Sequence, residues 1–191
     1  MLLARAKGAR LVFNVSDLWP ESAVQLGLVT NRWMIGASTW LEELCYRKAS
    51  LITGQTKGIV ANIQQRMPHK EVLWVPNGVD LDAIGQAEQA GDPLTARARL
   101  GIAPNDMVLT YAGIIGHAQG LEVVLQAADR LRDRRDIHFL LIGDGPEKGG
   151  LLQLKEQLQV PQVRFVDRMP RADLLALLRA TDAVVVPLRR N

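Results

Sequence analysis

The stretch MVLTYAGIIGHAQGLEVVLQAADR, residues 107–130, decides the fold class of this protein. The apolar run 107–113 predicts a buried strand. The following run, 120–134, predicts a helix with one apolar face, made of Leu121, Val124, Leu125, Ala128 and Leu131. A glycine-rich turn joins the two, which is how a strand of a parallel sheet passes into its crossover helix.

The same alternation runs through most of the chain. Apolar runs that predict strands lie at 11–15, 50–53, 71–76, 137–143, 163–166 and 182–188. Segments with helical periodicity lie at 33–49, 57–67, 147–159 and 171–180. Strands buried on both faces and alternating with helices predict an α/β protein with parallel sheets.

The amino-acid composition changes in the segment 81–106, which is polar and rich in Ala, Gly and Pro. We therefore expect two domains, 1–85 and 107–191, joined by a connector at 86–106. Each half predicts few strands, so both sheets are expected to be parts of larger, doubly wound domains.

Composition is that of a globular protein, with 48% hydrophobic and 23% charged residues. The formal net charge of +3 suits phosphate-bearing small molecules or an anionic membrane surface. It does not indicate nucleic acid, because no basic stripe with interleaved aromatics is present. A single cysteine, Cys45, excludes an internal disulfide and indicates a reducing compartment. No apolar run reaches the roughly 18 residues of a membrane span.

The glycine-rich turn has two interpretations. Gly113, Gly116 and Gly120 allow close backbone approach, and the helix that begins at Gly120 would offer free N–H groups and a positive dipole end to a phosphate. The alternative is a tight structural turn, because the spacing GxxGxxxG differs from the dinucleotide fingerprint. His117 is the one titratable side chain in the turn, which contains no Lys or Arg.

Other loops also follow predicted strands, and ligands of parallel α/β sheets bind at that edge. The loop 143–147 supplies Gly143 and Gly145, which also suit a plain turn. The loop 167–173 supplies Arg168 and Met169. The final segment supplies Arg189 and Arg190, which either reach the ligand or are simply solvated.

The remaining histidines do not indicate a metal site. His69 lies in a polar connector and is expected at the surface, whereas His138 lies in a predicted strand and is expected to be a packed or an edge residue. No Cys/His cluster has metal-ligand spacing, and no nucleophile motif such as GxSxG occurs.

Four motifs occur in the order that a known family uses: DLWPES (17–22), VPNGVD (75–80), YAGIIGHAQGLE (111–122) and LIGDGPE (141–147), followed by TDAVVVPL. Together they resemble the family 4 retaining glycosyltransferases of the GT-B fold, which has two Rossmann-like domains. The forms of the first and third motifs resemble the branch that builds O-antigen, capsule and exopolysaccharide, including N-acetylfucosaminyl transferases.

The resemblance implies transfer of a sugar from a nucleotide diphosphate sugar, expected to be a UDP-sugar, to a lipid-linked or saccharide acceptor with retention. It implies no cofactor, no metal and no nucleic-acid partner. The first half corresponds to the acceptor domain and the second half to the donor domain of a cytoplasmic, bacterial enzyme. The implied donor diphosphate site consists of Gly113, Gly116, His117, Gln119 and Gly120. The implied nucleotide side consists of Gly143, Gly145, Arg168 and Met169, and the implied interdomain cleft includes Asp17, Glu21, Asn77 and Gly78.

The turn departs from the family pattern in its charge. Many relatives have Arg and Lys where this chain has Ile114 and Gln119, and Gln119 donates a hydrogen bond without a charge. Neutralisation of the diphosphate is therefore expected from His117, the helix end, or Arg189 and Arg190. The family's acceptor-side histidine and donor-gripping carboxylates are expected outside residues 1–191, so the chain is expected to be an inactive part of a longer enzyme.

Two alternatives to a transferase remain open at this point. One is a nucleotide-sugar epimerase of GT-B fold, which would have other histidines and carboxylates around its cleft. The other is a non-catalytic module that binds a nucleotide-sugar or phosphate.

The helix predicted at 33–49 also has two interpretations. Trp33, Ala37, Trp40, Leu41 and Leu44 share one face, which is typical of a helix packed on a sheet. Tryptophans near Arg and Lys also suit the surface of an anionic membrane, although Glu42 and Glu43 weaken the basic character. Packing is the preferred interpretation, and peripheral contact with the inner face of the plasma membrane is the alternative.

Overall fold

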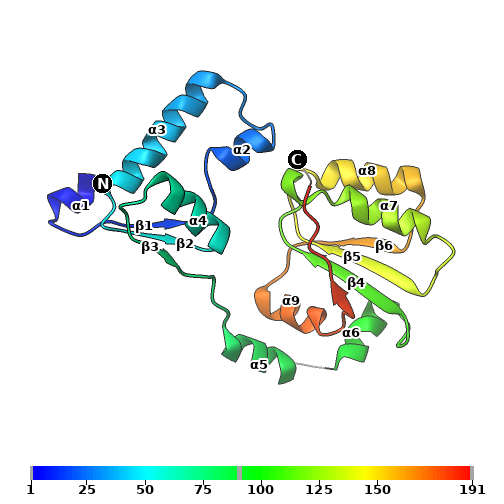
Figure 1. Ribbon diagram of the computed structural model, residues 1–191. Helices are drawn as coiled ribbons and strands as arrows, with labels where there is room; N and C mark the ends of the chain where they lie inside the picture. Colours follow the sequence, from blue (N-terminus) through cyan, green and yellow to red (C-terminus); the bar gives the residue numbers. More distant parts are fainter. Residues whose placement is uncertain (1, 90–91, 190–191) are drawn as a thin grey trace. The chain divides into compact units, whose positions relative to one another are not determined.

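A computed structural model describes residues 2–89 and 92–189 of the chain. The chain divides into two compact units between Val79 and Asp80, a few residues before the boundary that the sequence pattern suggests. Both units are α/β with parallel sheets, as predicted (Figure 1). Among the described residues, no helix is both long and apolar enough to cross a membrane.

The first unit contains a three-stranded parallel sheet of order β1-β2-β3. Its strands are β1 (Val12–Val15), β2 (Leu51–Gly54) and β3 (Val72–Trp74), all within the predicted runs or one residue from them. Its helices are α1 (Leu2–Ala6), α2 (Glu21–Gln25), α3 (Arg32–Lys48) and α4 (Lys57–Arg66). The core joins the strands to the carboxyl end of α3 and to α4 through Val15, Tyr46, Ala49, Ile52, Ile59, Ile63 and Val72.

The preferred interpretation of α3 is wrong. Trp33 is 90% exposed, Trp40 59% and Leu41 51%, so the face predicted to pack on the sheet is largely in solvent. The helix is instead anchored by Tyr46, which is fully buried beside Phe13. Figure 1 shows the amino-terminal turns of α3 extending beyond the strands of this unit.

The second unit contains a four-stranded parallel sheet of order β6-β5-β4-β7. Its strands are β4 (Met107–Ala112), β5 (Ile137–Ile142), β6 (Val163–Val166) and β7 (Ala183–Val184). The last strand is much shorter than the predicted run 182–188. Its helices are α5 (Leu81–Gln89), α6 (Pro93–Arg99), α7 (Glu122–Arg130), α8 (Lys148–Leu158) and α9 (Arg171–Leu178), with a short 3₁₀ turn η1 (His117–Gln119).

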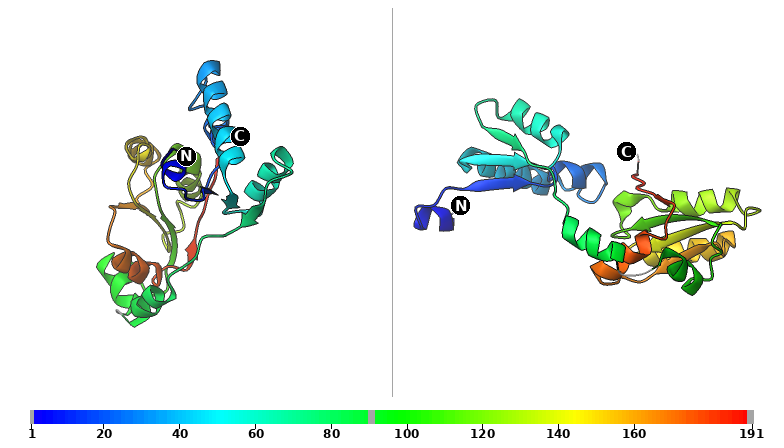
Figure 2. Two further views of the ribbon diagram at one scale, coloured as in Figure 1. Left: turned by 90° about the vertical axis from the view of Figure 1, so that its left-hand side faces the viewer. Right: turned by 90° about the horizontal axis from the view of Figure 1, so that it is seen from below.

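Helices cover both faces of this sheet, as two views show (Figures 1 and 2). One core lies between the sheet and α7 and α8, and it contains Leu121, Val124, Leu125 and Ala128, the predicted apolar face of α7. A second core, on the other face, packs α9 and the segment after α6 through Ile102, Val108, Leu140, Ile142, Leu174 and Leu177.

The segment predicted as a connector contributes α6, which is tied into the second unit by Arg97. Arg97 is 8% exposed, and its guanidinium donates to the carbonyls of Ala180, Pro104 and Asp106. It also contacts the Asp182 carboxylate at 2.8 Å. Burial of a charge is tolerated here because its donors are matched with acceptors. The contacts hold α6 beside the amino-terminal ends of β4 and β7.

The sheet order defines where a ligand would bind. From β4 the chain proceeds to β5 and β6 in one direction, and it then returns to place β7 on the other side of β4. The carboxyl ends of β4 and β7 therefore form a topological switch point, the position at which open α/β sheets bind ligands.

Candidate functional site

The glycine-rich turn follows β4 at this switch point and is braced by Tyr111. The Tyr111 hydroxyl donates to the carbonyl of Ile114 at 2.6 Å, and burial raises the pKa of this phenol. A Cβ on Gly113 would lie 2.8 Å from the Tyr111 Oη. A side chain at position 113 would therefore collide with the Tyr111 hydroxyl, so this position needs glycine. Tyr111 was not predicted as a site residue, because it lies in an apolar run of the sequence.

The loop 143–147 packs directly on this turn. Gly143 and Gly145 have φ of +142° and +157°, and a Cβ on them would lie 1.9 Å from the Gly113 carbonyl oxygen and 2.3 Å from that of Ile115. Two backbone hydrogen bonds join the loops, from Ile115 N to Asp144 O and from Glu147 N to Ile115 O. A tight turn at 143–145 therefore supports the turn at 113–116, as the plain-turn interpretation of these glycines predicts.

The predicted start of the helix at Gly120 is wrong by two residues. Residues 117–119 form η1, Gly120 adopts a left-handed conformation with φ +56°, and α7 begins at Glu122. The left-handed residue breaks the helix and redirects the chain. Gly116 is extended, and a Cβ there would meet the side-chain oxygen of Gln119 at 2.9 Å.

Arg189 lies against the turn. Its backbone N–H donates to the Ala118 carbonyl at 2.9 Å, and a Cβ on Gly120 would lie 3.3 Å from the Arg189 nitrogen. Its guanidinium Nη1 is 2.9 Å from Nδ1 and 2.7 Å from Nε2 of His117. The structure thus brings together two of the groups that the sequence suggested for neutralisation, His117 and Arg189. Arg190, the neighbouring candidate, lies outside the described residues.

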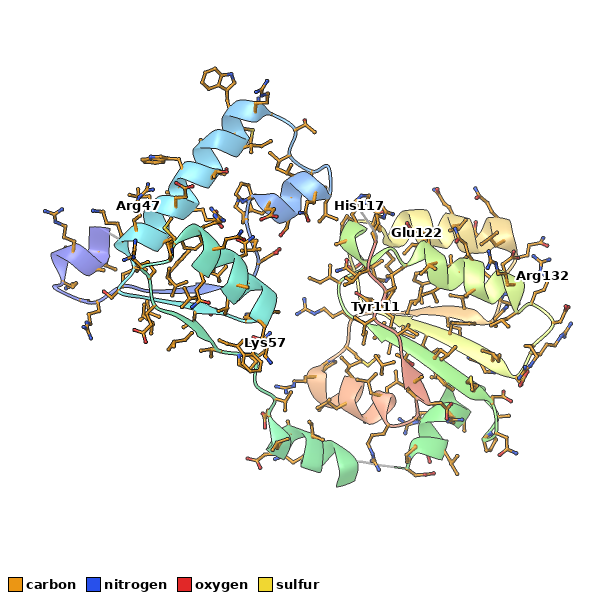
Figure 3. All side chains as sticks on the ribbon, viewed as in Figure 1. Arg47, Lys57, Tyr111, His117, Glu122 and Arg132 are labelled. Atoms are coloured by element: carbon orange, nitrogen blue, oxygen red, sulfur yellow. The ribbon has the colours of Figure 1, made fainter. Side chains whose placement is uncertain are left out.

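Glu122, which was not predicted as a site residue, pairs with Arg189 through Oε1 and Nη2. Burial raises the pKa of the Glu122 carboxyl, but hydrogen bonds from its own backbone N–H and from Arg189 outweigh burial, so the pKa lies below its ordinary value. Figure 3 shows Glu122 and His117 at the same end of α7, with Tyr111 below them. A carboxylate in the first turn of a helix is the signal that could have found this residue.

A pocket of about 490 Å³ adjoins the turn on the side of β5 and α9. It brings together four of the residues predicted for the donor, namely Gly113, Gly143, Arg168 and Met169. Ile114, Asp144 and Arg171 also line it, whereas Gly145, Gly116 and Gly120 do not.

Lys148 stands near this pocket and was not predicted. Its Nζ lies 2.6 Å from Asp167 and 3.4 Å from the Gly143 carbonyl. The hydrogen bond to Asp167 raises the pKa of Lys148, so the ammonium stays charged at neutral pH. The lysine thereby links the loop after β5 to the loop after β6.

The four residues predicted for a cleft lie in the first unit. Asp17 follows β1 and accepts a hydrogen bond from the Ser22 hydroxyl, and Glu21 begins α2. Asn77 and Gly78 follow β3, and the Asn77 amide lies 3.5 Å from Gln55. Asp17 also lines a pocket of about 400 Å³ with Asn14, Ser16, Trp19, Glu42 and Tyr46 among others.

The other histidines lie where the sequence placed them. His69 is exposed, and His138 is buried in β5 with its Nε2 2.8 Å from Asp106. Over residues 2–89 and 92–189, no group of three or more His, Cys, Asp or Glu side chains could hold a metal ion.

Comparison with curated proteins finds a similar chain in Escherichia coli K12. The putative colanic acid biosynthesis glycosyl transferase WcaI is 28% identical over an alignment of 194 residues, which takes in 100% of this chain and 47% of WcaI. A D-inositol 3-phosphate glycosyltransferase of Mycobacterium sp. strain JLS is 34% identical over 117 residues, covering 58% of this chain and 25% of that protein. The chain therefore spans about half the length of WcaI, and its match to the mycobacterial protein spans a quarter of that protein.

Solved structures show the same fold. HepE of Anabaena in complex with UDP-glucose matches with a TM-score of 0.72 and 20% identity, over 96% of this chain and 48% of HepE. WaaG, a glycosyltransferase of lipopolysaccharide biosynthesis, matches with a TM-score of 0.71 and 19% identity, over 94% of this chain and 50% of WaaG. These neighbours are GT-B glycosyltransferases, which confirms the predicted fold class.

The family model described as "Glycosyl transferases group 1" matches residues 94–190, a span that begins in α6 and includes every strand of the second unit. This span contains the glycine-rich turn, the loop that packs on it and the residues after β7. Because the match covers half of the chain, the protein belongs to the group 1 glycosyl transferases.

Proposed function

We propose that this protein transfers a sugar from a UDP-sugar to a saccharide acceptor on a lipid carrier, with retention of the anomeric configuration. In this proposal the second unit binds the donor and the first unit binds the acceptor, in the synthesis of a bacterial cell-surface polysaccharide. The observation that carries the proposal is the glycine-rich turn at the switch point of the second sheet, with Arg189 and the start of α7 beside it.

The donor would lie across two adjoining surfaces. Gly113, Gly116, His117, Gln119 and Gly120 would receive the diphosphate, because backbone and side-chain donors gather at that end of α7. The pocket lined by Gly143, Arg168 and Met169 would receive the nucleoside. HepE, whose structures are described as complexes with UDP and with UDP-glucose, supports the choice of nucleotide.

Titration calorimetry of the chain with UDP, UDP-glucose, GDP and ADP tests this donor site. We expect UDP to bind and Gly116→Val to abolish binding, because the valine would cover the turn where the phosphates approach. Gly116 has an extended backbone that any residue adopts, so the variant should fold.

Gly149→Val is the matched control, since a Cβ at Gly149 meets no atom within 4 Å in α8. Equal UDP affinity in Gly116→Val and the unmodified chain would contradict the proposed site. Preference for GDP or ADP would correct the nucleotide alone.

The acceptor carries a lipid in this proposal, and the first unit offers a surface for a membrane. Exposed apolar side chains of α3 include Trp33, Met34, Trp40 and Leu41. Arg32, Arg47 and Lys48 lie on the same helix, and tryptophan and basic residues together favour an anionic interface. The charge is partly offset, because Arg47 pairs with Glu43 at 3.2 Å.

Co-sedimentation with vesicles tests this membrane contact. We expect binding to vesicles with anionic lipid at low salt, weaker binding at high salt, and little binding to neutral vesicles. Equal binding to both kinds of vesicle, or binding to neither, would contradict the electrostatic attraction.

A further inference from the structure

Arg189 and Glu122 are 67 residues apart in the chain and form an ion pair at the proposed diphosphate site. The pairing of β7 with β4 is what brings them together, because it places the residues after β7 beside the turn after β4. Had β7 extended the sheet beyond β6 instead, two strands, β6 and β5, would separate it from β4 and the turn.

Contacts of both the backbone and the side chain hold Arg189 in place. The Arg189 backbone is anchored to Ala118, and Gly120 leaves just enough room for that backbone. The side chain is 31% exposed, so it is partly shielded from water but open to a ligand. His117 and Glu122 each contact one terminal nitrogen, and a guanidinium has five N–H donors, so donors remain for further acceptors.

The Glu122 carboxylate already uses the groups that a phosphate would need. It lies in the first turn of α7, where the helix dipole favours an anion, and it accepts a hydrogen bond from its own backbone N–H. It also takes the positive charge of Arg189. The carboxylate therefore occupies the place beside Arg189 and the first turn of α7 that an anionic ligand would take.

On the basis of the proposed function, we propose that Arg189 is the cation that binds the diphosphate of the donor. Glu122 holds Arg189 over the glycine-rich turn and has to release or share it when the diphosphate binds. Glu122 is then a positioning residue that sets the affinity of the site. Arg189 supplies the positive charge that many relatives obtain from basic residues at the positions of Ile114 and Gln119.

Two effects of removing the Glu122 charge oppose each other. Loss of the ion pair frees the Arg189 side chain, which costs little because a partly exposed pair contributes little. Loss of the Glu122 charge also removes its repulsion of a diphosphate a few ångströms away. At the effective dielectric of a protein surface, this repulsion is larger than the contribution of the ion pair. Removal of the charge should therefore strengthen binding of the ligand.

Calorimetry of the chain with UDP and with inorganic pyrophosphate tests the inference. Arg189→Met keeps an unbranched apolar side chain but removes the charge and the N–H donors, and we expect it to weaken both ligands about tenfold or more. Arg189→Lys keeps the charge without the fork and should give a smaller loss. We expect Glu122→Gln to tighten both ligands roughly three- to tenfold.

The Arg132–Asp129 pair supplies matched controls, because it also involves α7 but lies at the opposite end of the helix (Figure 3). Arg132→Met and Asp129→Asn change the net charge by the same amounts and should leave both affinities unchanged. Circular dichroism of each variant verifies that it is folded.

Three results would overturn the inference while leaving the proposed function intact. They are unchanged affinity in both Arg189 variants, weaker binding in Glu122→Gln, and equal tightening in Glu122→Gln and Asp129→Asn. Failure of the unmodified chain to bind either UDP or pyrophosphate would instead refute the proposed donor site together with the inference.

Discussion

Two helices with the same kind of sequence pattern, α3 and α7, have opposite outcomes in the structure. Both carry a row of apolar side chains at helical spacing. In α7 this row is buried, with Leu125 and Ala128 at 0% exposure, whereas in α3 Trp33 is 90% exposed. A helical apolar row therefore indicates that a face needs a partner, but only the neighbouring elements decide whether the same unit provides one.

The contrast follows from how each helix meets its sheet. α7 crosses over between the adjacent strands β4 and β5, so it lies along the sheet and covers it. α3 meets its sheet through its last turns, where Tyr46 is buried and its hydroxyl donates to Glu42 at 2.6 Å. Glu42 in turn pairs with Arg66 of α4 at 2.6 Å. The anchor of α3 is thus an aromatic ring with a charged pair around it.

The largest expected effect is on the core under α7. Leu125→Ala should destabilise the second unit by about 2–5 kcal/mol, because it removes a fully buried side chain and leaves a cavity. Hydrogen exchange of the β4 and β5 amides is the suitable measurement, since all four tryptophans lie in the first unit and do not report on this one. Val123→Ala, at a half-exposed position of the same helix, should change protection little. Equal losses in both variants would contradict the buried row.

A smaller effect is expected at the charged anchor of α3. Arg66→Met leaves the Glu42 carboxylate, 9% exposed, without its partner, and should cost about 1–3 kcal/mol. Urea unfolding followed by tryptophan fluorescence measures this in the first unit. Arg47→Met is the control, because its pair with Glu43 is exposed and should contribute less than about 1 kcal/mol. The anchor would be refuted if the two variants were equally stable.

The two units should also differ in their response to pH. Burial, and then the hydrogen bond to Glu42, raise the pKa of Tyr46 above its ordinary value of 10.0. The protonated phenol therefore adds stability to the first unit that is complete below pH 10 and is lost as pH rises toward the folded-state pKa. Tyr46→Phe should remove this alkaline loss when unfolding is followed by tryptophan fluorescence.

The second unit should respond to acid instead. A hydrogen bond from the Val108 N–H lowers the pKa of Asp182 against the effect of burial, and Arg97 lowers it further. This stability is complete above the ordinary value of 3.8 and is lost as pH falls through the folded-state pKa. In hydrogen exchange, Asp182→Asn should flatten the acid dependence of the β4 amides. An unchanged dependence would exclude Asp182 as its source.

The smallest effect on stability is expected from the exposed tryptophans of α3. Trp33→Ser and Trp40→Ser should each change the free energy of unfolding by about 0.5 kcal/mol or less, because little of each ring is buried. Both should nevertheless weaken binding to anionic vesicles if this face meets the membrane. Trp74→Ser, a half-exposed tryptophan of β3 beside Lys57, is the control that should leave vesicle binding unchanged.

The sequence by itself determined the class of the fold and the place of most elements. Strand β5 and helix α7 were predictable because local periodicity reports which residues a chain must bury. The glycine pattern marked the turn after β4, because glycine favours the positive φ of Gly120 and only glycine allows the backbone contacts of Gly143. The sequence alone also suggested Arg189 as a source of charge, from its place near a predicted strand end.

Only the tertiary structure decided which of these parts meet. The return of β7 to the side of β4 places Arg189 on the glycine-rich turn and gives it Glu122 as a partner, a contact across 67 residues that no local pattern encodes. The exposed row of α3 was likewise undecidable from periodicity, because the row is the same whether the opposing surface is protein or solvent. The physical reason is common to both cases: local sequence sets what each segment can form, whereas long-range strand pairing and packing set what each side chain faces.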